Sequence, residues 1–451
     1  MSKPRDRDHD PKPAPLDLTR RQLLPLVGAT AASAVILPSS IAAAPADTSP
    51  SLTAGKARFV YVGTYTFPGT APGGTHQSQA KGIYVFRSNS SNGGLTLVQV
   101  VEIPNPSYLA LDPTLTHLYS VNEMTDGAVS AFAINQTNGM LTFINMMPTN
   151  GQDTTHLSVQ PSGLYLFAAS YTSGNFQVFP INGDGSIGNM TDNFQSVGNG
   201  TGPNPARQEG PHAHQILTDL DGNHVFGVDL GADKVNVWNL DPSTGVLNPN
   251  TVPFAGIASG SGPRHMAFHP DRQHAYVLSE LVSAVTVFTY DPVRAAFIWQ
   301  QTISALPPDF TGTNTAAEIR IHPSGRFLYT TNRGHNSVAM FEIEQETGEL
   351  EVIGWESTRG EWPRGMNIDP SGTFLYAATS TPTTSPSSAS SVRTEGSGSA
   401  RSLIRRRRST SSLVHRPDLL MSGGKLDGLR AAGAERDRQA QAEQARAYSR
   451  S

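Results

Sequence analysis

Histidine, glutamate and arginine side chains lie at equivalent places in several repeats of this sequence, and together they could do acid–base chemistry. Imidazole and carboxylate groups take up and release protons, as a general base or acid must. Guanidinium groups bind carboxylate and phosphate, or negative charge that forms during a reaction. The candidates for proton transfer are His156, His212, His214, Glu280 and Glu318. The candidates for substrate binding are Tyr108, Arg207, Arg264, His265, Arg333 and Arg364.

The candidates keep a fixed spacing from an aromatic residue that recurs along the chain. Most lie eleven or twelve residues before such an aromatic anchor or four residues after it, a position that also holds Tyr65, Glu123 and Tyr171. A period near 50 residues is typical of β-propeller blades. The anchors are separated by 58, 48, 59, 50, 53 and 47 residues, and they are Tyr61, Tyr119, Phe167, Phe226, Tyr276, Tyr329 and Tyr376.

Each repeat contains alternating strand sequences and a hairpin turn with glycine, such as Ser243-Thr244-Gly245. This pattern predicts one four-stranded antiparallel sheet per repeat. Seven such sheets arranged radially bury each other's faces, so the sequence predicts an all-β, seven-bladed β-propeller over residues 55–380. The start of the innermost strand and the end of the second lie at the same end of an antiparallel blade. We therefore expect the candidates to share a polar pocket at one mouth of the propeller.

Each candidate residue could instead have a purely structural role. The arginines could form salt bridges between neighbouring blades, and any single histidine could be an ordinary hydrogen-bonded polar residue. A histidine cluster could bind a metal, but the HExxH spacing is absent and the two candidate glutamates come from separate blades. We expect neither a metal nor a cofactor. Other histidines, in turns before proline or at strand edges, are interpreted as scaffold or surface residues: His117, His224, His269, His274 and His322.

The composition restricts the kind of partner. The chain has no cysteine, which excludes disulfides, thiolate metal sites and cysteine nucleophiles. Residues 51–380 hold 14 Lys and Arg residues against 26 Asp and Glu residues, a net charge of −12. Nucleic-acid binding depends on basic residues that neutralise phosphates, so an acidic body disfavours it. We expect a small-molecule partner and no nucleic acid.

Residues 1–46 have the order of an export signal. Arg20 and Arg21 precede an apolar stretch from Leu23 to Leu37, and Ala44-Pro45-Ala46 suits a cleavage site. Paired arginines before such a stretch are typical of the signal read by the twin-arginine export machinery. The stretch is shorter than the roughly 20 apolar residues that cross a bilayer. We expect a periplasmic or secreted protein with no stable membrane span after removal of the signal.

Several ordered motifs resemble those of the lactonase family of seven-bladed β-propellers. The resemblance covers residues 58 to about 378 and implies a hydrolase that opens a sugar-acid lactone. The substrate would be 6-phosphogluconolactone or, given the export signal, an unphosphorylated aldonolactone. Two alternatives stay open, a lactonising cycloisomerase and a non-catalytic propeller that binds a small ligand or a protein. The motifs include Asn105-Pro106-Ser107-Tyr108-Leu109, Pro211-His212-Ala213-His214, Gly262-Pro263-Arg264-His265, Ala317-Glu318-Ile319 and Asn332-Arg333-Gly334-His335.

The resemblance also implies roles for the candidates. Lactone hydrolysis needs a general base that activates water and cationic donors that stabilise the oxyanion. His156, with Glu280 or Glu318, would supply the base. His212 or His214 would protonate the leaving oxygen, and no covalent nucleophile is required. The oxyanion and the anionic group of the substrate would be held by Arg207, Arg264 and Arg333.

The chain departs from the family pattern after Ala378. The family continues there with outer strands of the seventh blade and a last strand that completes the first blade. Here the sequence becomes rich in serine, threonine and arginine, and residues 381–451 hold 13 basic against 6 acidic residues. We predict that the outer strands of the seventh blade are missing, that the propeller is incompletely closed, and that the tail is disordered.

Overall fold

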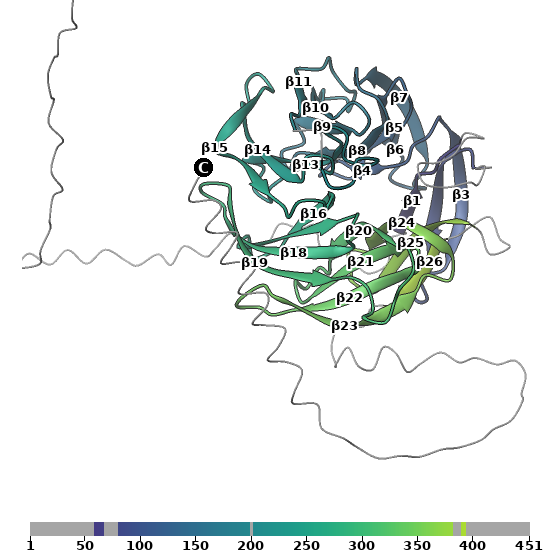
Figure 1. Ribbon diagram of the computed structural model, residues 1–451. Coiled ribbons are helices and arrows are strands. Elements are labelled where there is room, and N and C mark those ends of the chain that lie inside the picture. Colours follow the sequence, from purple (N-terminus) through teal and green to yellow (C-terminus); the bar gives the residue numbers. More distant parts are fainter. Residues whose placement is uncertain (1–57, 67–79, 199–201, 382–388, 394–451) are drawn as a thin grey trace, which may run out of the picture. The chain divides into compact units, whose positions relative to one another are not determined.

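The computed structural model describes residues 58–66, 80–198, 202–381 and 389–393, which all belong to one compact unit, Ala57–Ser451. Within these ranges every regular element is a β-strand, and the strands form seven antiparallel sheets. The sheets follow one another around a central axis, with the earliest strand of each sheet nearest the axis (Figure 1). The predicted all-β propeller with seven blades is therefore confirmed.

Five of the seven sheets have four strands each, and the first and seventh have three. The first sheet contains β1 (Arg58–Val62), β2 (Gly82–Ser88) and β3 (Leu95–Glu102). The second and third sheets contain β4 (Leu109–Leu111), β5 (His117–Asn122), β6 (Ala128–Ile134), β7 (Leu141–Pro148), β8 (Thr154–Val159), β9 (Tyr165–Ser170), β10 (Asn175–Pro180) and β11 (Asp192–Gln195).

The remaining four sheets continue in chain order. The fourth and fifth contain β12 (Ala213–Thr218), β13 (His224–Asp229), β14 (Lys234–Leu240), β15 (Leu247–Gly256), β16 (Pro263–Phe268), β17 (His274–Ser279), β18 (Ala284–Asp291) and β19 (Ala296–Ser304). The sixth and seventh contain β20 (Thr315–Ile321), β21 (Phe327–Arg333), β22 (Ser337–Ile343), β23 (Leu350–Ser357), β24 (Glu361–Ile368), β25 (Phe374–Thr381) and β26 (Ala389–Arg393).

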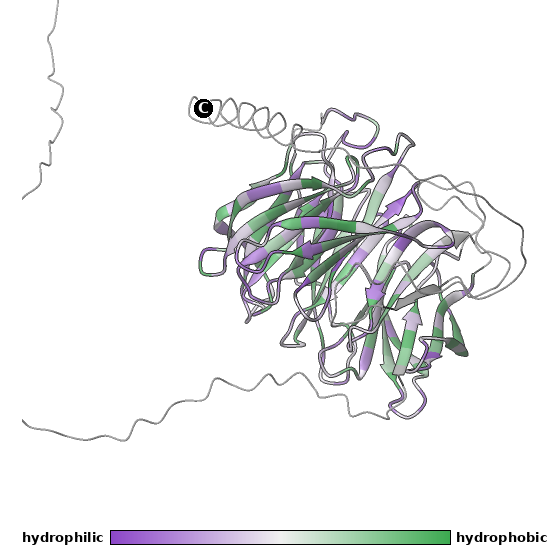
Figure 2. Cartoon of the chain, turned by 90° about the horizontal axis from the view of Figure 1, so that it is seen from below, coloured by the Kyte–Doolittle hydropathy of each residue, from purple (hydrophilic) through white to green (hydrophobic). Residues whose placement is uncertain are grey.

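The hydrophobic core lies between neighbouring sheets. Every residue of β9 and of β17 is buried, whereas the outer strands β15 and β19 are partly exposed. One core cluster joins Tyr276 and Val285 of the fifth sheet to Ile319 and Phe341 of the sixth. Figure 2 shows hydrophobic residues along the strands and hydrophilic residues at many turns. Each sheet is therefore stabilised mainly by its two neighbours.

The recurrent aromatic anchors also hydrogen-bond across the junctions between sheets. The hydroxyl of Tyr119 donates to the carbonyl oxygen of Gly185 in the outer hairpin of the next sheet, at 3.0 Å. Tyr61 and Tyr276 make the same contact, and Tyr376 of the seventh sheet donates to Gly93 of the first at 3.1 Å. This last bond joins the seventh sheet to the first.

The first and seventh sheets are incomplete. Tyr61 lies in β1, so β1 corresponds to the second strand of the other sheets, and among the described residues no strand pairs with its inner edge. Consistent with a missing inner strand, Phe59 to Val62 are only half-buried. Incomplete closure is thus confirmed. The prediction that all outer strands of the seventh sheet are missing is wrong, because β26 pairs with β25 from Phe374 to Ala378.

Other predictions fall outside the described residues. These are the signal at residues 1–46 and the disorder of the tail, of which residues 381 and 389–393 alone are described. Where the structure is described, no helix is long and apolar enough to cross a membrane. The domain boundaries at residues 55 and 380 remain predictions.

Candidate active site

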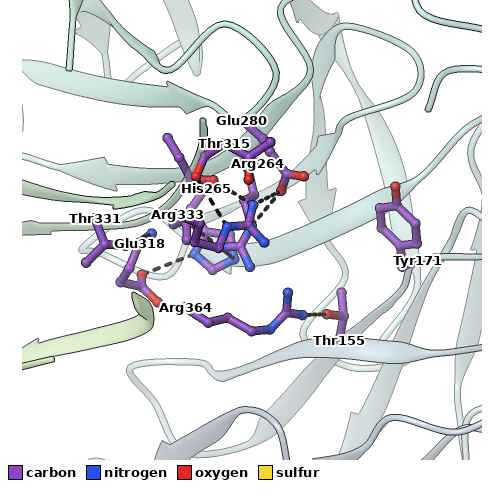
Figure 3. Close-up of polar contacts among 12 residues, drawn as sticks. Thr155, Tyr171, Arg264, His265, Glu280, Thr315, Glu318, Thr331, Arg333 and Arg364 are labelled. Atoms are coloured by element: carbon purple, nitrogen blue, oxygen red, sulfur yellow. Dashed lines mark hydrogen bonds and ion pairs between the residues drawn. The ribbon is translucent and has the colours of Figure 1, made fainter. Parts of the chain in front are cut away.

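The predicted residues come together at one end of the strands, near the axis. Arg264 and His265 begin β16, Glu280 follows β17, and Arg333 ends β21. The inner strands of other sheets add His156 in β8, His214 in β12, Glu318 in β20 and Arg364 in β24. Figure 3 shows Arg264, His265 and Arg333 grouped between Glu280 and Glu318, with Arg364 extended toward Thr155.

Three arginines hold one buried carboxylate. Oε1 of Glu280 lies 2.6 Å from Arg207, while Oε2 lies 2.9 Å from Arg264 and 2.7 Å from Arg333. Burial alone would raise the pKa of Glu280, but the three guanidinium groups outweigh it and hold the pKa below its ordinary range. Glu280 is therefore an anion that fixes the arginines and is a poor partner for His156 as a base.

Arg264 lies at the centre of this group. It is almost fully buried and donates a hydrogen bond to the carbonyl oxygen of Ala317. Burial first, and then repulsion from Arg333 and Arg364, lowers its pKa to about 9. Such a strongly desolvated cation gains much from a new negative charge nearby, so Arg264 is well placed to stabilise an oxyanion.

A second buried cluster joins His265 to Glu318. Nδ1 of His265 lies 3.1 Å from Oε1 of Glu318, and Arg320 contacts the same oxygen at 3.1 Å. Burial first, and then Arg264, holds the pKa of His265 well below its ordinary value, so the ring is neutral. Since Nδ1 donates to the carboxylate, we assign the lone pair to Nε2. A neutral imidazole oriented by a carboxylate is suited to act as a general base.

His156 has the opposite tautomer. Its Nδ1 accepts the backbone N–H of Ile216 at 3.4 Å, so its hydrogen is assigned to Nε2. Burial first, and then His265, keeps the pKa of His156 well below its ordinary value. The contacts of the described residues include no hydrogen bond from His156 to either glutamate. Glu318 binds His265 instead, which leaves His156 as a hydrogen-bond donor toward the site.

His212 and His214 differ in their freedom to react. Nδ1 of His212 lies 3.1 Å from the carbonyl oxygen of Tyr171 and Nε2 lies 3.0 Å from Glu209, so both ring nitrogens are occupied. Nδ1 of His214 is buried without a hydrogen-bond partner, and its ring lies 5.1 Å from the ring of His265. Of the two predicted proton donors, His214 has the available nitrogen.

Arg207 and Arg364 are the more exposed of the predicted arginines. The side chain of Arg207 is 36% exposed and also donates to the hydroxyl of Tyr171 at 3.2 Å. The side chain of Arg364 is 20% exposed and donates to the hydroxyl of Thr155 at 3.2 Å. Their exposure makes them the guanidinium groups that an entering anion would meet first.

Two charged residues of the site were not among the predicted ones. Arg320 binds Glu318 and donates to the hydroxyl of Tyr108 at 2.9 Å. It lies two residues after Glu318 in β20, so the two side chains are on the same side of the strand. This spacing could have identified Arg320 from the sequence. Glu123 lies 3.6 Å from Arg364, at the position four residues after the anchor Tyr119. The site thus has a net charge of +2, from five arginines (Arg207, Arg264, Arg320, Arg333 and Arg364) and three glutamates (Glu123, Glu280 and Glu318).

The comparisons with known proteins agree with this architecture. A family model described as "Lactonase, 7-bladed beta-propeller" matches residues 59–385. A 6-phosphogluconolactonase of Bacillus subtilis is 37% identical over 320 residues, which are 70% of this chain and 87% of that protein. A 6-phosphogluconolactonase of Serratia proteamaculans is 35% identical over 301 residues, 66% of this chain and 85% of that protein.

Two solved structures are also similar. The periplasmic gluconolactonase of Pseudomonas aeruginosa has a TM-score of 0.66 and 30% identity, over 72% of this chain and 89% of that chain. A putative 6-phosphogluconolactonase of Bacteroides fragilis has a TM-score of 0.65 and 32% identity, over 73% and 89%. The resemblance seen in the motifs and the predicted class of enzyme, a lactonase, are thereby confirmed. This chain belongs to the lactonase family of seven-bladed β-propellers.

Proposed function

We propose that this protein hydrolyses a sugar-acid lactone by general-base activation of water at the site described above. The observation that carries the proposal is the Glu318–His265 pair, in which the unprotonated Nε2 of His265 accepts a hydrogen bond from Nη1 of the buried Arg264 at 3.4 Å. A base and a desolvated cation side by side are what attack of water on a lactone carbonyl requires.

The reaction runs through one tetrahedral intermediate. Nε2 of His265 takes a proton from water while the water oxygen bonds to the carbonyl carbon. Arg264 and the Nε2–H of His156 stabilise the negative charge on the former carbonyl oxygen. The ring carbon–oxygen bond then breaks, and the leaving oxygen takes a proton from protonated His265 or through His214. General-base assistance supplies about 10²- to 10⁴-fold.

The charge of the site favours an anionic substrate. The carboxylates Glu123, Glu280 and Glu318 only partly neutralise the five arginines around them. Arg207 and Arg364, the exposed ones, would hold a phosphate or carboxylate of the substrate. This supports 6-phosphogluconolactone, the substrate in the names of several relatives. The Pseudomonas aeruginosa neighbour supports gluconolactone as the alternative substrate.

The test is the rate of ring opening of both lactones, measured as proton release against the spontaneous rate. The protein should accelerate at least one of them, and His265→Gln should remove the acceleration. The matched control is His117→Gln, at the first residue of β5 and outside the site. If the folded protein accelerates neither lactone, or if His265→Gln retains full activity, the proposed reaction and base are wrong.

We also propose that the protein reaches the periplasm or the exterior through the twin-arginine machinery. The support is the Arg20-Arg21 pair before the apolar stretch and the periplasmic location in the name of one structural neighbour. Replacement of both arginines with lysine should retain the protein in the cytoplasmic fraction. Unchanged export of this variant would contradict the proposal.

A further inference from the structure

A second group of metal-ligand side chains lies at the other end of the fifth sheet. His269 follows β16, His274 begins β17, and Asp271 lies in the turn between them. One ligand atom of each residue lies within 4.8 Å of those of the other two. Arg264 and His269 are five positions apart along β16, which corresponds to about 17 Å. The group is therefore separate from the active site.

The equivalent turns of other sheets identify a scaffold contact of His269. Its Nε2 lies 2.7 Å from the carbonyl oxygen of Gly325 in the next sheet. His322 and Gln160, at the equivalent positions, make the same contact between sheets at 2.9 and 3.0 Å. A carbonyl oxygen only accepts, so Nε2 of His269 carries a hydrogen and a neutral ring has its lone pair on Nδ1.

That lone pair lies against a carboxylate, unlike its equivalent in the next sheet. In the next sheet, Nδ1 of His322 lies 2.8 Å from the hydroxyl of Ser324, which can donate a hydrogen bond. At the position equivalent to Ser324, the fifth sheet has Asp271, and its Oδ2 lies 2.8 Å from Nδ1 of His269. The backbone N–H of Asp271 donates to this Nδ1 at 3.2 Å, but the carboxylate oxygen lies closer, and a cation between Nδ1 and Oδ2 would be attracted to both.

We propose that His269, Asp271 and His274 bind one divalent transition-metal ion of the Zn²⁺ class. Nδ1 of His274 lies 2.7 Å from the same Oδ2. Two imidazoles and a carboxylate are a common Zn²⁺ donor set, which leaves a fourth position for water. The carbonyl of Gly325 is the kind of outer partner that orients a metal-binding histidine.

A metal ion can enter the site with small movements of these side chains. The backbone N–H of Asp271 donates to Nδ1 of His269 at 3.2 Å, and a metal ion at Nδ1 would replace this hydrogen bond. In tetrahedral coordination with bonds of about 2.1 Å, ligand atoms are about 3.4 Å apart. The observed separations from Oδ2 of Asp271 to the two histidine nitrogens are 2.8 and 2.7 Å, and the partly exposed carboxylate can move away to reach the larger spacing. Nδ1 of His274 releases its proton when the metal binds.

The bound metal would join two sheets. His269 contacts Gly325 of the sixth sheet, and the ring of His274 lies against Gly348 of that sheet, where a side chain would find no space. Metal binding to the native state but not to the unfolded chain raises stability. We expect Zn²⁺ to raise the Tm by about 5 °C at a free concentration about 100 times Kd.

The test uses the untagged full chain, stripped with EDTA, and Zn²⁺ alone as the probe. Calorimetry should give one binding site per chain, and the Tm should rise with Zn²⁺. The double variant Asp271→Ser, His274→Phe reproduces the turn of the sixth sheet, which has Ser324 and Phe327, and keeps His269 on Gly325. It should bind Zn²⁺ at least tenfold more weakly and lose the rise in Tm.

The matched control is His224→Phe, at the equivalent strand start of the fourth sheet, which should leave Zn²⁺ binding unchanged. The proposal is overturned if the wild-type protein binds no Zn²⁺, or if the folded double variant binds it equally well. Circular dichroism of both variants establishes that they are folded. A nitrogen-15 spectrum with a protonated Nδ1 on His269 in the presence of Zn²⁺ would also overturn the proposal.

Discussion

Nδ1 of His265 lies 3.1 Å from Oε1 of Glu318, and both side chains are buried. The carboxylate fixes the tautomer that leaves Nε2 of His265 unprotonated, where it accepts a hydrogen bond from Arg264. Glu318→Gln keeps the shape but offers an amide that can turn its NH₂ toward Nδ1. The ring would then carry its hydrogen on Nε2. We expect kcat to fall by about 10²- to 10⁴-fold with a small change in KM, measured as lactone-dependent proton release.

A conservative change at the same residue separates this effect from unfolding. Glu318→Asp retains a carboxylate and should recover part of the lost kcat. If Glu318→Gln keeps a normal kcat and an unchanged Tm, Glu318 does not orient the base.

Acid should destabilise the protein below pH 6.5. Burial holds the pKa values of His156, His214 and His265 well below the ordinary value of about 6.5. As the pH falls below 6.5, these histidines bind protons in the unfolded chain but not in the folded protein, so the unfolded state is favoured. Each contributes up to about 1.4 kcal/mol per pH unit. Denaturant titrations at pH 7, 6 and 5 should show this loss, which His265→Gln should reduce.

The carboxylate of Glu280 balances three guanidinium groups, two of them buried. Glu280→Gln leaves these charges without a partner, and we expect the free energy of unfolding to fall by about 3–5 kcal/mol. The control is Glu342→Gln in the exposed pair with Arg326, which should change it by less than about 1 kcal/mol. Equal effects of the two changes in urea denaturation would contradict this role.

Arg364 should distinguish substrates by charge. Arg364→Gln removes a partly exposed cation that would bind the phosphate of 6-phosphogluconolactone, and a charge-assisted hydrogen bond contributes about 1.5–3 kcal/mol. We expect KM for this lactone to rise about 10- to 100-fold, with a much smaller change for gluconolactone. Parallel changes in KM for both lactones would place the phosphate elsewhere.

The hydroxyl of Tyr376 joins the seventh sheet to the first through its bond to Gly93. The same hydroxyl lies 2.9 Å from Oγ of Ser88 in the first sheet, so Tyr376→Phe loses two hydrogen bonds and should lower the free energy of unfolding by about 1–3 kcal/mol. Tyr329→Phe is the matched control, because Tyr329 makes no corresponding bond with the described residues. A larger loss from Tyr329→Phe, measured by urea denaturation, would show that the hydroxyl of Tyr376 is not important for joining the two sheets.

The repeat spacing was sufficient to predict the fold and the end of the strands at which the site lies. The aromatic anchors fixed the register, so residues such as Arg264 and Glu280 could be assigned to one mouth. The spacing could not predict which side chains contact each other within the site, because Glu318 can face His156 or His265 depending on the angle between sheets. The tautomers depend on backbone contacts, such as that of Ile216, which no spacing reveals. The β26 strand was missed because its serine-rich sequence has no strand pattern.

Among the described residues, the first and seventh sheets have three strands each, which leaves a seam between them, and the residues of the site lie unequally about it. Arg364 belongs to β24 beside the seam, whereas Arg264, His265 and Glu318 belong to the fifth and sixth sheets. Local opening is easiest where backbone pairing is least complete. The contribution of Arg364 to anion binding would therefore weaken when this region opens locally, whereas Arg207, which precedes the fourth sheet, and the proton-transfer groups stay in place. Substrate binding thus depends in part on a region that opens more readily than the region that carries out proton transfer.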